Sequence, residues 1–163
     1  MSDNKESGPL IGLLGEWPGE LTCDNTANLQ RRYPIAIIST GIVVNVPTAH
    51  GNIYNKEAVK MAVKEFNNIA SKYKGIPGGI LNRQHIGQID KITHKTMELF
   101  LNDSDLLCAR IKIIDKDLYM KLLEGHTMIA RPIIVLPGYE LEHKPMNVTN
   151  IVNIGRVHLE GLS

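Results

Sequence analysis

The chain has 163 residues, of which 43% are hydrophobic and 21% are charged, and its formal net charge at neutral pH is +1. These values are typical of one globular domain with a sizeable core. They exclude the broad positive field that attracts nucleic acid or an anionic membrane, and no apolar run approaches the ~20 residues of a membrane-spanning helix. We therefore expect no nucleic-acid partner and no membrane partner.

Cysteine and histidine spacing gives no sign of a cofactor or metal site. Cys23 and Cys108 lie far apart in the sequence, which favours reduced thiols over a disulfide framework. The six histidines lack the spacing that is typical of metal ligands. We expect no metal and no cofactor.

Residues 1–33 differ from the rest because they are rich in Gly, Pro, Asn and Asp, with an apolar stretch at 10–14 and a single tryptophan, Trp17. We interpret them as an extended N-terminal arm, although a floppy tail is the alternative. A large aromatic residue gains most when it is buried. We therefore expect the arm to dock on its own domain or on a neighbouring subunit, with Leu13 and Trp17 in the interface.

The first half of the remaining chain predicts a long strand and then a helix. β-branched residues dominate 35–46, with Gly41 as a bend or bulge. Apolar residues then recur at helical spacing over 56–73, after the suitable N-cap Asn55. The residues at this spacing are Val59, Ala62, Val63, Phe66, either Ile69 or Ala70, and Tyr73. The face of Val59, Val63, Phe66 and Ala70 is expected to pack on the rest of the domain.

The second half predicts a strand hairpin, a short helix and two further strands. The strands of the hairpin are 89–101 and 106–114, separated by the turn sequence NDSD. Asp115 should cap a helix that ends before Gly125, with Leu118, Leu122 and Leu123 facing inward. The last two strands are expected near 127–136 and 150–160. This order indicates the α+β class.

Several segments, in order, resemble the prohead proteases of tailed phages. The sequence HGNIYNKEAVKMAVKEF is similar to the family's Asn-x-x-Tyr turn and helix, GGILNRQH to its segment with the catalytic histidine, QIDKITHKTMEL and NDSDLLCARIKIID to the next two strands, and LYMKLLEGHTMIARPIIV to the helix, glycine and strand that present the nucleophile. The resemblance covers roughly 41–160. It implies a herpesvirus assemblin-like fold over 34–163, namely a small β-barrel of about five to seven mostly antiparallel strands flanked by two or more helices.

Both catalytic positions depart from the family pattern. The family's serine follows the glycine by some six residues, which places Arg131 there, or Ile129 or Ala130 after a small shift. None of these side chains can attack a carbonyl, because covalent catalysis needs a hydroxyl or thiol that a base can activate. Arg83 stands where the resemblance expects histidine, and His85 follows two residues later.

Other residues near these positions allow more than one interpretation. His85 is either a relic general base or a polar surface residue, and His94 is either a satisfied core histidine or a remnant of a triad. Proline lacks a ladder donor, so Arg131-Pro132 within a strand indicates an edge or a bulge. Such an edge is either an interface or a simple bulge. After Ser104 there is no serine until Ser163.

These observations favour a catalytically inactive, protease-like structural or assembly protein of a bacteriophage head. It would bind a capsid or internal core protein in the virion after synthesis in the host cytoplasm, and self-association into a homo-oligomer is also open. The alternative is an active prohead maturation protease with a rearranged site. A binding domain unrelated to phage is a third hypothesis, supported only by the ordinary composition.

Overall fold

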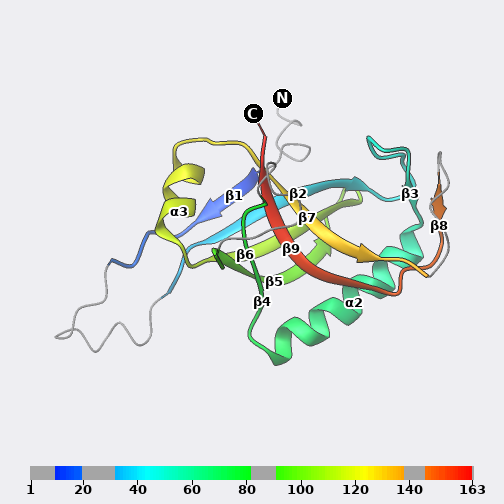
Figure 1. The fold of residues 1–163 in the computed structure, drawn as a ribbon, viewed down its shortest axis with the longest axis horizontal. Helices are drawn as coiled ribbons and strands as arrows, with labels where there is room; N and C mark the ends of the chain where they lie inside the picture. Colours follow the sequence, from blue (N-terminus) through cyan, green and yellow to red (C-terminus); the bar gives the residue numbers. More distant parts are fainter. Residues whose placement is uncertain (1–9, 20–31, 82–90, 138–145, 163) are drawn as a thin grey trace.

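The computed structural model describes residues 10–19, 32–81, 91–137 and 146–162. Figure 1 shows the order of the helices and strands in this part of the chain. They are β1 (Leu10–Leu14), β2 (Ile35–Val43), β3 (Ile53–Tyr54), α2 (Lys56–Lys72), β4 (Ile76–Gly78), β5 (His94–Leu101), β6 (Leu106–Ile113), α3 (Lys116–Leu123), β7 (Met128–Val135), β8 (Asn147–Val148) and β9 (Asn153–Gly161).

The strands form a five-stranded antiparallel sheet in the order β1-β2-β6-β5-β4, an antiparallel ribbon of β7 and β9, and a short parallel pair of β3 and β8. The α+β class with mostly antiparallel strands is therefore confirmed. Among the described strands no sheet closes into a barrel, so the predicted small barrel is not confirmed. The described strands outnumber the predicted five to seven because β3, β4 and β8 are only two or three residues long.

The core lies between the five-stranded sheet and the β7–β9 ribbon, which crosses in front of it in Figure 1. Fully buried side chains from the sheet and the ribbon meet there: Ile38, Leu107, Ile111, Ala130, Val157 and Leu159. Helix α2 packs against β5 and β9, α3 contacts β6, and β7 lies against β2.

Both helices begin at the predicted caps. The side chain of Asn55 accepts a hydrogen bond from the Ala58 amide at 3.2 Å, and that of Asp115 accepts one from the Leu118 amide at 3.1 Å. These bonds satisfy amides that have no partner inside a helix.

The inward faces of the helices were predicted with two errors. Tyr73 is 70% exposed and Leu123 is 56% exposed, whereas of the two alternatives Ile69 and Ala70 the buried one is Ala70, with Ile69 42% exposed. Successive residues of a helix are rotated by about 100° about its axis, so the neighbour of a buried residue can point away from the core. Ile69 is beside buried Ala70 in this way, Leu123 is beside buried Leu122, and Tyr73 is already the C-cap of α2.

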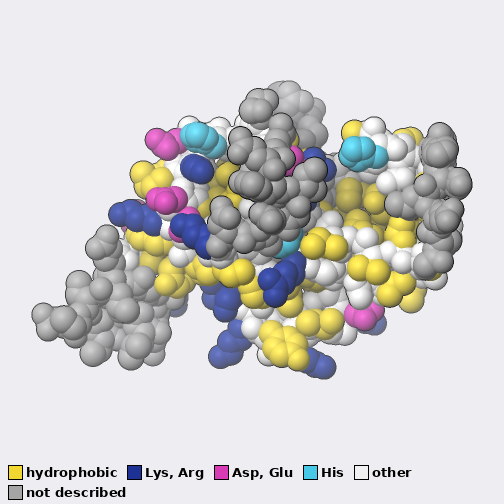
Figure 2. Space-filling view, viewed as in Figure 1, with side chains coloured by type: hydrophobic (Ala, Val, Ile, Leu, Met, Phe, Trp, Pro, Cys, Tyr) yellow, Lys and Arg dark blue, Asp and Glu magenta, His cyan; other side chains and the backbone are white. Residues whose placement is uncertain are grey.

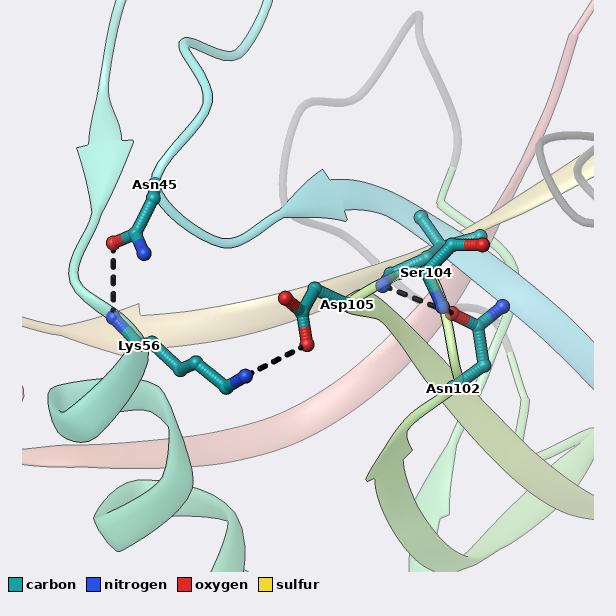
Figure 3. Close-up of polar contacts among 6 residues, drawn as sticks. Asn45, Lys56, Asn102, Ser104 and Asp105 are labelled. Atoms are coloured by element: carbon teal, nitrogen blue, oxygen red, sulfur yellow. Dashed lines mark hydrogen bonds and ion pairs between the residues drawn. The ribbon is translucent and has the colours of Figure 1, made fainter.

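A polar clamp joins the start of α2 to the β5–β6 turn (Figure 3). The Lys56 ammonium lies 3.1 Å from the Asp105 carboxylate, and the Lys56 amide donates to Asn45 Oδ1 at 3.3 Å. In the turn itself, Asn102 Oδ1 accepts from the Ser104 amide at 2.8 Å. The predicted NDSD hairpin turn is confirmed, and these contacts link the start of the helix to it.

The N-terminal arm packs onto its own chain over the described residues. β1 pairs with the first half of β2, and Leu13 stands opposite Ala36 in that pairing. The Trp17 ring packs between Tyr33 and Tyr119, with ring centroids 5.8 and 5.7 Å apart. Docking of the arm on its own domain, one of the two expected arrangements, is therefore observed for 10–19.

Candidate functional site

Strand β7 holds the position where the family resemblance expects a serine, and an ion pair is found there. Arg131 stands opposite His158 in the β7–β9 ladder. Its Nε lies 2.7 Å from Glu160 Oε1, and the arginine side chain is 42% exposed. The sequence of β7, MIARPIIV, has no serine, threonine or cysteine, so this strand offers no conventional covalent nucleophile.

Pro132 fits into β7 without loss of a ladder hydrogen bond. The Leu162 amide donates to the Thr127 carbonyl at 2.9 Å, and the register then continues unchanged to Pro132. Backbone groups of alternate residues face opposite sides of a strand, so the nitrogen of Pro132 points away from β9. The register shifts between Pro132 and Ile134, which agrees with the bulge that was one of the alternatives for Arg131-Pro132.

Arg131 and Pro132 also line an open groove of about 410 Å³ between β7 and the end of β2. Its other lining residues come from β2, the following loop, β3 and β7: Thr40, Gly41, Ile42, Thr48, Ala49, His50, Asn52, Tyr54, Ile129 and Ile134. The lining mixes hydroxyl, amide and apolar groups, which suits an extended polypeptide segment as well as a small polar ligand.

Exposed apolar side chains lie on the same ribbon. On the face shown in Figure 2, hydrophobic side chains gather over the end of β7. Ile133 is 48% exposed, Val135 is 41% exposed, and Val152 is 50% exposed. The Val152 amide donates to the Val135 carbonyl at 2.8 Å, which holds these two residues together. We call Ile133, Val135 and Val152 the ribbon patch.

His94, predicted as a core histidine or a triad remnant, is completely buried at the start of β5. Its Nε2 lies 2.8 Å from the Val157 carbonyl oxygen, and its Nδ1 lies 3.0 Å from Thr93 Oγ1. A carbonyl only accepts, so Nε2 carries the proton and Nδ1 accepts from the Thr93 hydroxyl. Both ring nitrogens therefore have partners inside the protein.

Burial lowers the pKa of His94 to about 4, because the charged imidazolium would lose its hydration. The Val157 hydrogen bond partly opposes this shift, and nearby His158 adds to it. His94 is consequently neutral at pH 7. A base with so low a pKa is weak at neutral pH.

His158 is a site residue that sequence reasoning missed. It is 5% exposed, and its Nδ1 accepts a hydrogen bond from the Gly79 amide at 3.2 Å. Burial, together with the Arg156 cation, lowers its pKa. The available signal was its place in the last predicted strand, but only the β7–β9 register puts it opposite Arg131.

The remaining sequence-predicted residues are not brought to this place by the described structure. Arg83 and His85 lie outside the described residues. Leu13 and Trp17 are partly buried against the core of their own chain. In the described ranges no group of three or more His, Cys, Asp or Glu side chains could hold a metal ion, and no helix is long and apolar enough to cross a membrane.

Comparison with known proteins bears on the fold. No protein-family description and no curated protein matches the sequence. Among solved structures, the chain resembles the bacteriophage T4 capsid assembly protease, gp21, with a TM-score of 0.63 and 12% sequence identity over 96% of this chain and 94% of that chain. The chain therefore shares its fold with a phage capsid assembly protease.

Proposed function

We propose that this chain is a protein of a bacteriophage head that has a capsid-protease fold but does not cleave peptide bonds. It binds a capsid or internal core protein during assembly and remains in the head. The observation that carries this proposal is the Arg131–Glu160 ion pair at the expected serine position, on a fold shared with a capsid assembly protease.

The chemistry around Arg131 supports the absence of peptidase activity. Arginine cannot lose its proton in a protein and has no acceptor atom, so it cannot attack a carbonyl. The candidate base His94 is neutral and weak, with both nitrogens engaged. A triad depends on its members acting together, and the family resemblance puts Arg131 at the nucleophile position and Arg83 at the histidine position.

We place the binding surface at the groove beside Arg131 and Pro132 and at the ribbon patch next to it. Leu13 and Trp17 contribute less than the sequence predicts, because part of their surface packs onto their own chain. Neighbouring exposed apolar residues are a common mark of protein interfaces. This surface combines them with a groove of mixed polar and apolar lining.

The barrel implied by the family resemblance stays part of the proposal. Residues beyond β4 pass to β9, where Ile80 bridges Leu159 in parallel, and β7 lies against β2 at the opposite side. We infer that the five-stranded sheet and the ribbon together act as a barrel that is open between β2 and β7.

The test is co-expression with the capsid and core proteins of the same phage, followed by purification of heads. We expect the chain to co-purify with heads, with no cleavage of either protein that depends on it. Ile133→Asp should lower its copy number in heads. Met61→Asp is the matched control, because Met61 is 73% exposed on α2, away from the groove lining and the ribbon patch.

Three results would contradict parts of the proposal. Cleavage that requires this chain would establish the active-protease alternative. Equal incorporation of both variants, each with an unchanged melting temperature, would place the binding surface elsewhere. Absence of the chain from heads at every stage of assembly would remove the assembly role.

A further inference from the structure

The two sheets are joined along a short seam, which we define as Gly78–Leu81 on one side and Val157–Leu159 on the other. The chain leaves the five-stranded sheet after β4 and runs beside β9. The Leu159 amide donates to the Gly79 carbonyl at 2.9 Å, and the Leu81 amide donates to the Leu159 carbonyl at 2.7 Å. Only these two backbone bonds join the described strands along the seam.

Two imidazoles complete the seam from opposite sides. His94 reaches across from β5 to the Val157 carbonyl, and His158 on β9 reaches back to the Gly79 amide. The packing is tight, since a Cβ atom on Gly78 would lie 2.3 Å from the Val157 oxygen and 2.7 Å from His94 Nε2. Each ring therefore takes the place of a missing backbone hydrogen bond.

The two imidazoles respond differently to a proton. A proton on His94 Nδ1 turns that atom into a donor, and the Thr93 hydroxyl 3.0 Å away can rotate to accept from it. A proton on His158 Nδ1 instead points at the Gly79 amide, which can only donate. The His158–Gly79 bond is then lost, and the buried Gly79 amide keeps no partner across the seam.

We propose that the seam is a proton-operated latch, in which a proton on His158 Nδ1 releases Gly79 and loosens Gly78–Leu81 from β9. We expect the five-stranded sheet and α2 to stay folded, because neither the ladder pairing of the sheet nor the backbone of the helix involves this ring. The proposal is independent of the proposed role in the phage head. The latch predicts that Gly78–Leu81 separates from β9 in weak acid, and β9 is the pairing partner of the groove strand β7.

The charged groups around His158 set the pH range of the latch. Arg131 faces it from β7, Arg156 and Glu160 flank it on β9, and His94 approaches from β5. Glu160 is held by Arg131 at 2.7 Å, and the passing segment 79–81 carries no titratable side chain. Burial and the Arg156 cation thus oppose protonation of His158.

The sign of the pH dependence follows from the two histidines. Both folded-state pKa values lie below the ordinary value of 6.5. The folded state therefore binds fewer protons than the unfolded chain, so the seam is at full strength above about pH 6.5. It weakens as the pH falls below that value and through the folded-state pKa of His158.

Amide hydrogen exchange on the full chain tests the latch. Protection factors of Gly79, Leu81 and Leu159 should fall at least about tenfold between about pH 7.5 and pH 4.5, as expected when one buried hydrogen bond is lost. The amide of Ile111 in the central strand β6 reports on global unfolding. Its protection also falls somewhat in acid, because the unfolded chain binds more protons, but it should stay above that of the seam amides at both pH values. The midpoint of the change should equal the His158 titration midpoint measured by NMR.

His158→Asn is the decisive variant, because asparagine Oδ1 replaces Nδ1 as an acceptor and does not titrate. It should keep the seam protected at both pH values, whereas the exposed-residue control His126→Asn should behave as the unmodified chain does. Unchanged seam protection in the unmodified chain would overturn the proposal. Equal losses of seam protection in His158→Asn and in the unmodified chain would also overturn it. If the variant fails to fold, the unmodified chain decides: a pH midpoint of seam protection that matches the titration of another histidine would overturn the proposal.

Discussion

The packing of α2 on the sheet and the meeting of β4 with β9 hold the molecule together in different ways. Under α2 most contacts are apolar, with Phe66 3% exposed at the centre, and one polar side chain, Asn67, exchanges two hydrogen bonds with the Leu99 backbone. Along the seam the contacts are polar groups that satisfy each other, with Gly78 beneath an imidazole. Apolar packing tolerates substitutions that keep the volume, whereas a buried polar network requires each partner. Residue identity is thus more tightly constrained at the seam.

The largest effect is expected from Phe66→Ala at the centre of the α2 interface. Loss of a buried aromatic ring should lower the free energy of unfolding by about 3–5 kcal/mol, from lost burial and a residual cavity. Chemical denaturation measures this. The control Met61→Ala, on the exposed side of the same helix, should change stability by less than about 0.5 kcal/mol. Similar small values for both variants would mean that the α2 face contributes little.

Gly78→Ala probes the seam, with an expected loss of about 1–3 kcal/mol. The added Cβ would meet a backbone oxygen at 2.3 Å, and backbone moves less easily than the end of a flexible side chain. Gly12→Ala in β1 is the matched control, since a Cβ there has no atom within 4 Å among the described residues. The seam would be more adaptable than we infer if both alanine variants melted at the same temperature.

Much of α2 was predictable and most of the seam was not, for a physical reason. Periodicity and capping are local, so the residues from Asn55 onward revealed the helix and most of its inward face. The contacts of His94 with Val157 and of His158 with Gly79 span 63 and 79 residues. Only the fold brings such groups together.

The candidate site shows the same division. The missing hydroxyl on β7 and the bulge at Pro132 are readable from the sequence. The Arg131–Glu160 ion pair needs the β7–β9 register, and so does the place of His158. β1 was missed as a strand because it has no alternating pattern, and its pairing partner β2 is supplied by tertiary structure.

Two buried threonines in the five-stranded sheet extend the comparison to single hydroxyl groups. Removal of the two hydroxyls should change the stability of the fold in opposite directions. Thr96 is fully buried and its Oγ1 has no hydrogen-bond partner among the described residues, so Thr96→Val should stabilise the fold by about 1 kcal/mol. Thr40 Oγ1 donates to the Leu107 carbonyl at 2.8 Å, so Thr40→Val should destabilise it by a similar amount. Thermal melting of both variants decides the signs, and two changes of the same sign would contradict this assignment.

The smallest stability effect and the sharpest functional test belong to Arg131→Ser. The ion pair with Glu160 is partly exposed, and such pairs contribute about 0–1 kcal/mol. The fold should therefore survive. The new hydroxyl should stay unreactive toward a fluorophosphonate probe, because the fully buried His94 already donates Nε2–H to Val157 and accepts a hydrogen bond from the Thr93 hydroxyl at Nδ1. Glu160→Gln is the control, because it removes the charge of the same pair without adding a nucleophile. Labelling of Arg131→Ser but not of Glu160→Gln would show that a working base still reaches β7. The absence of a serine would then be the sole reason for the proposed lack of peptidase activity.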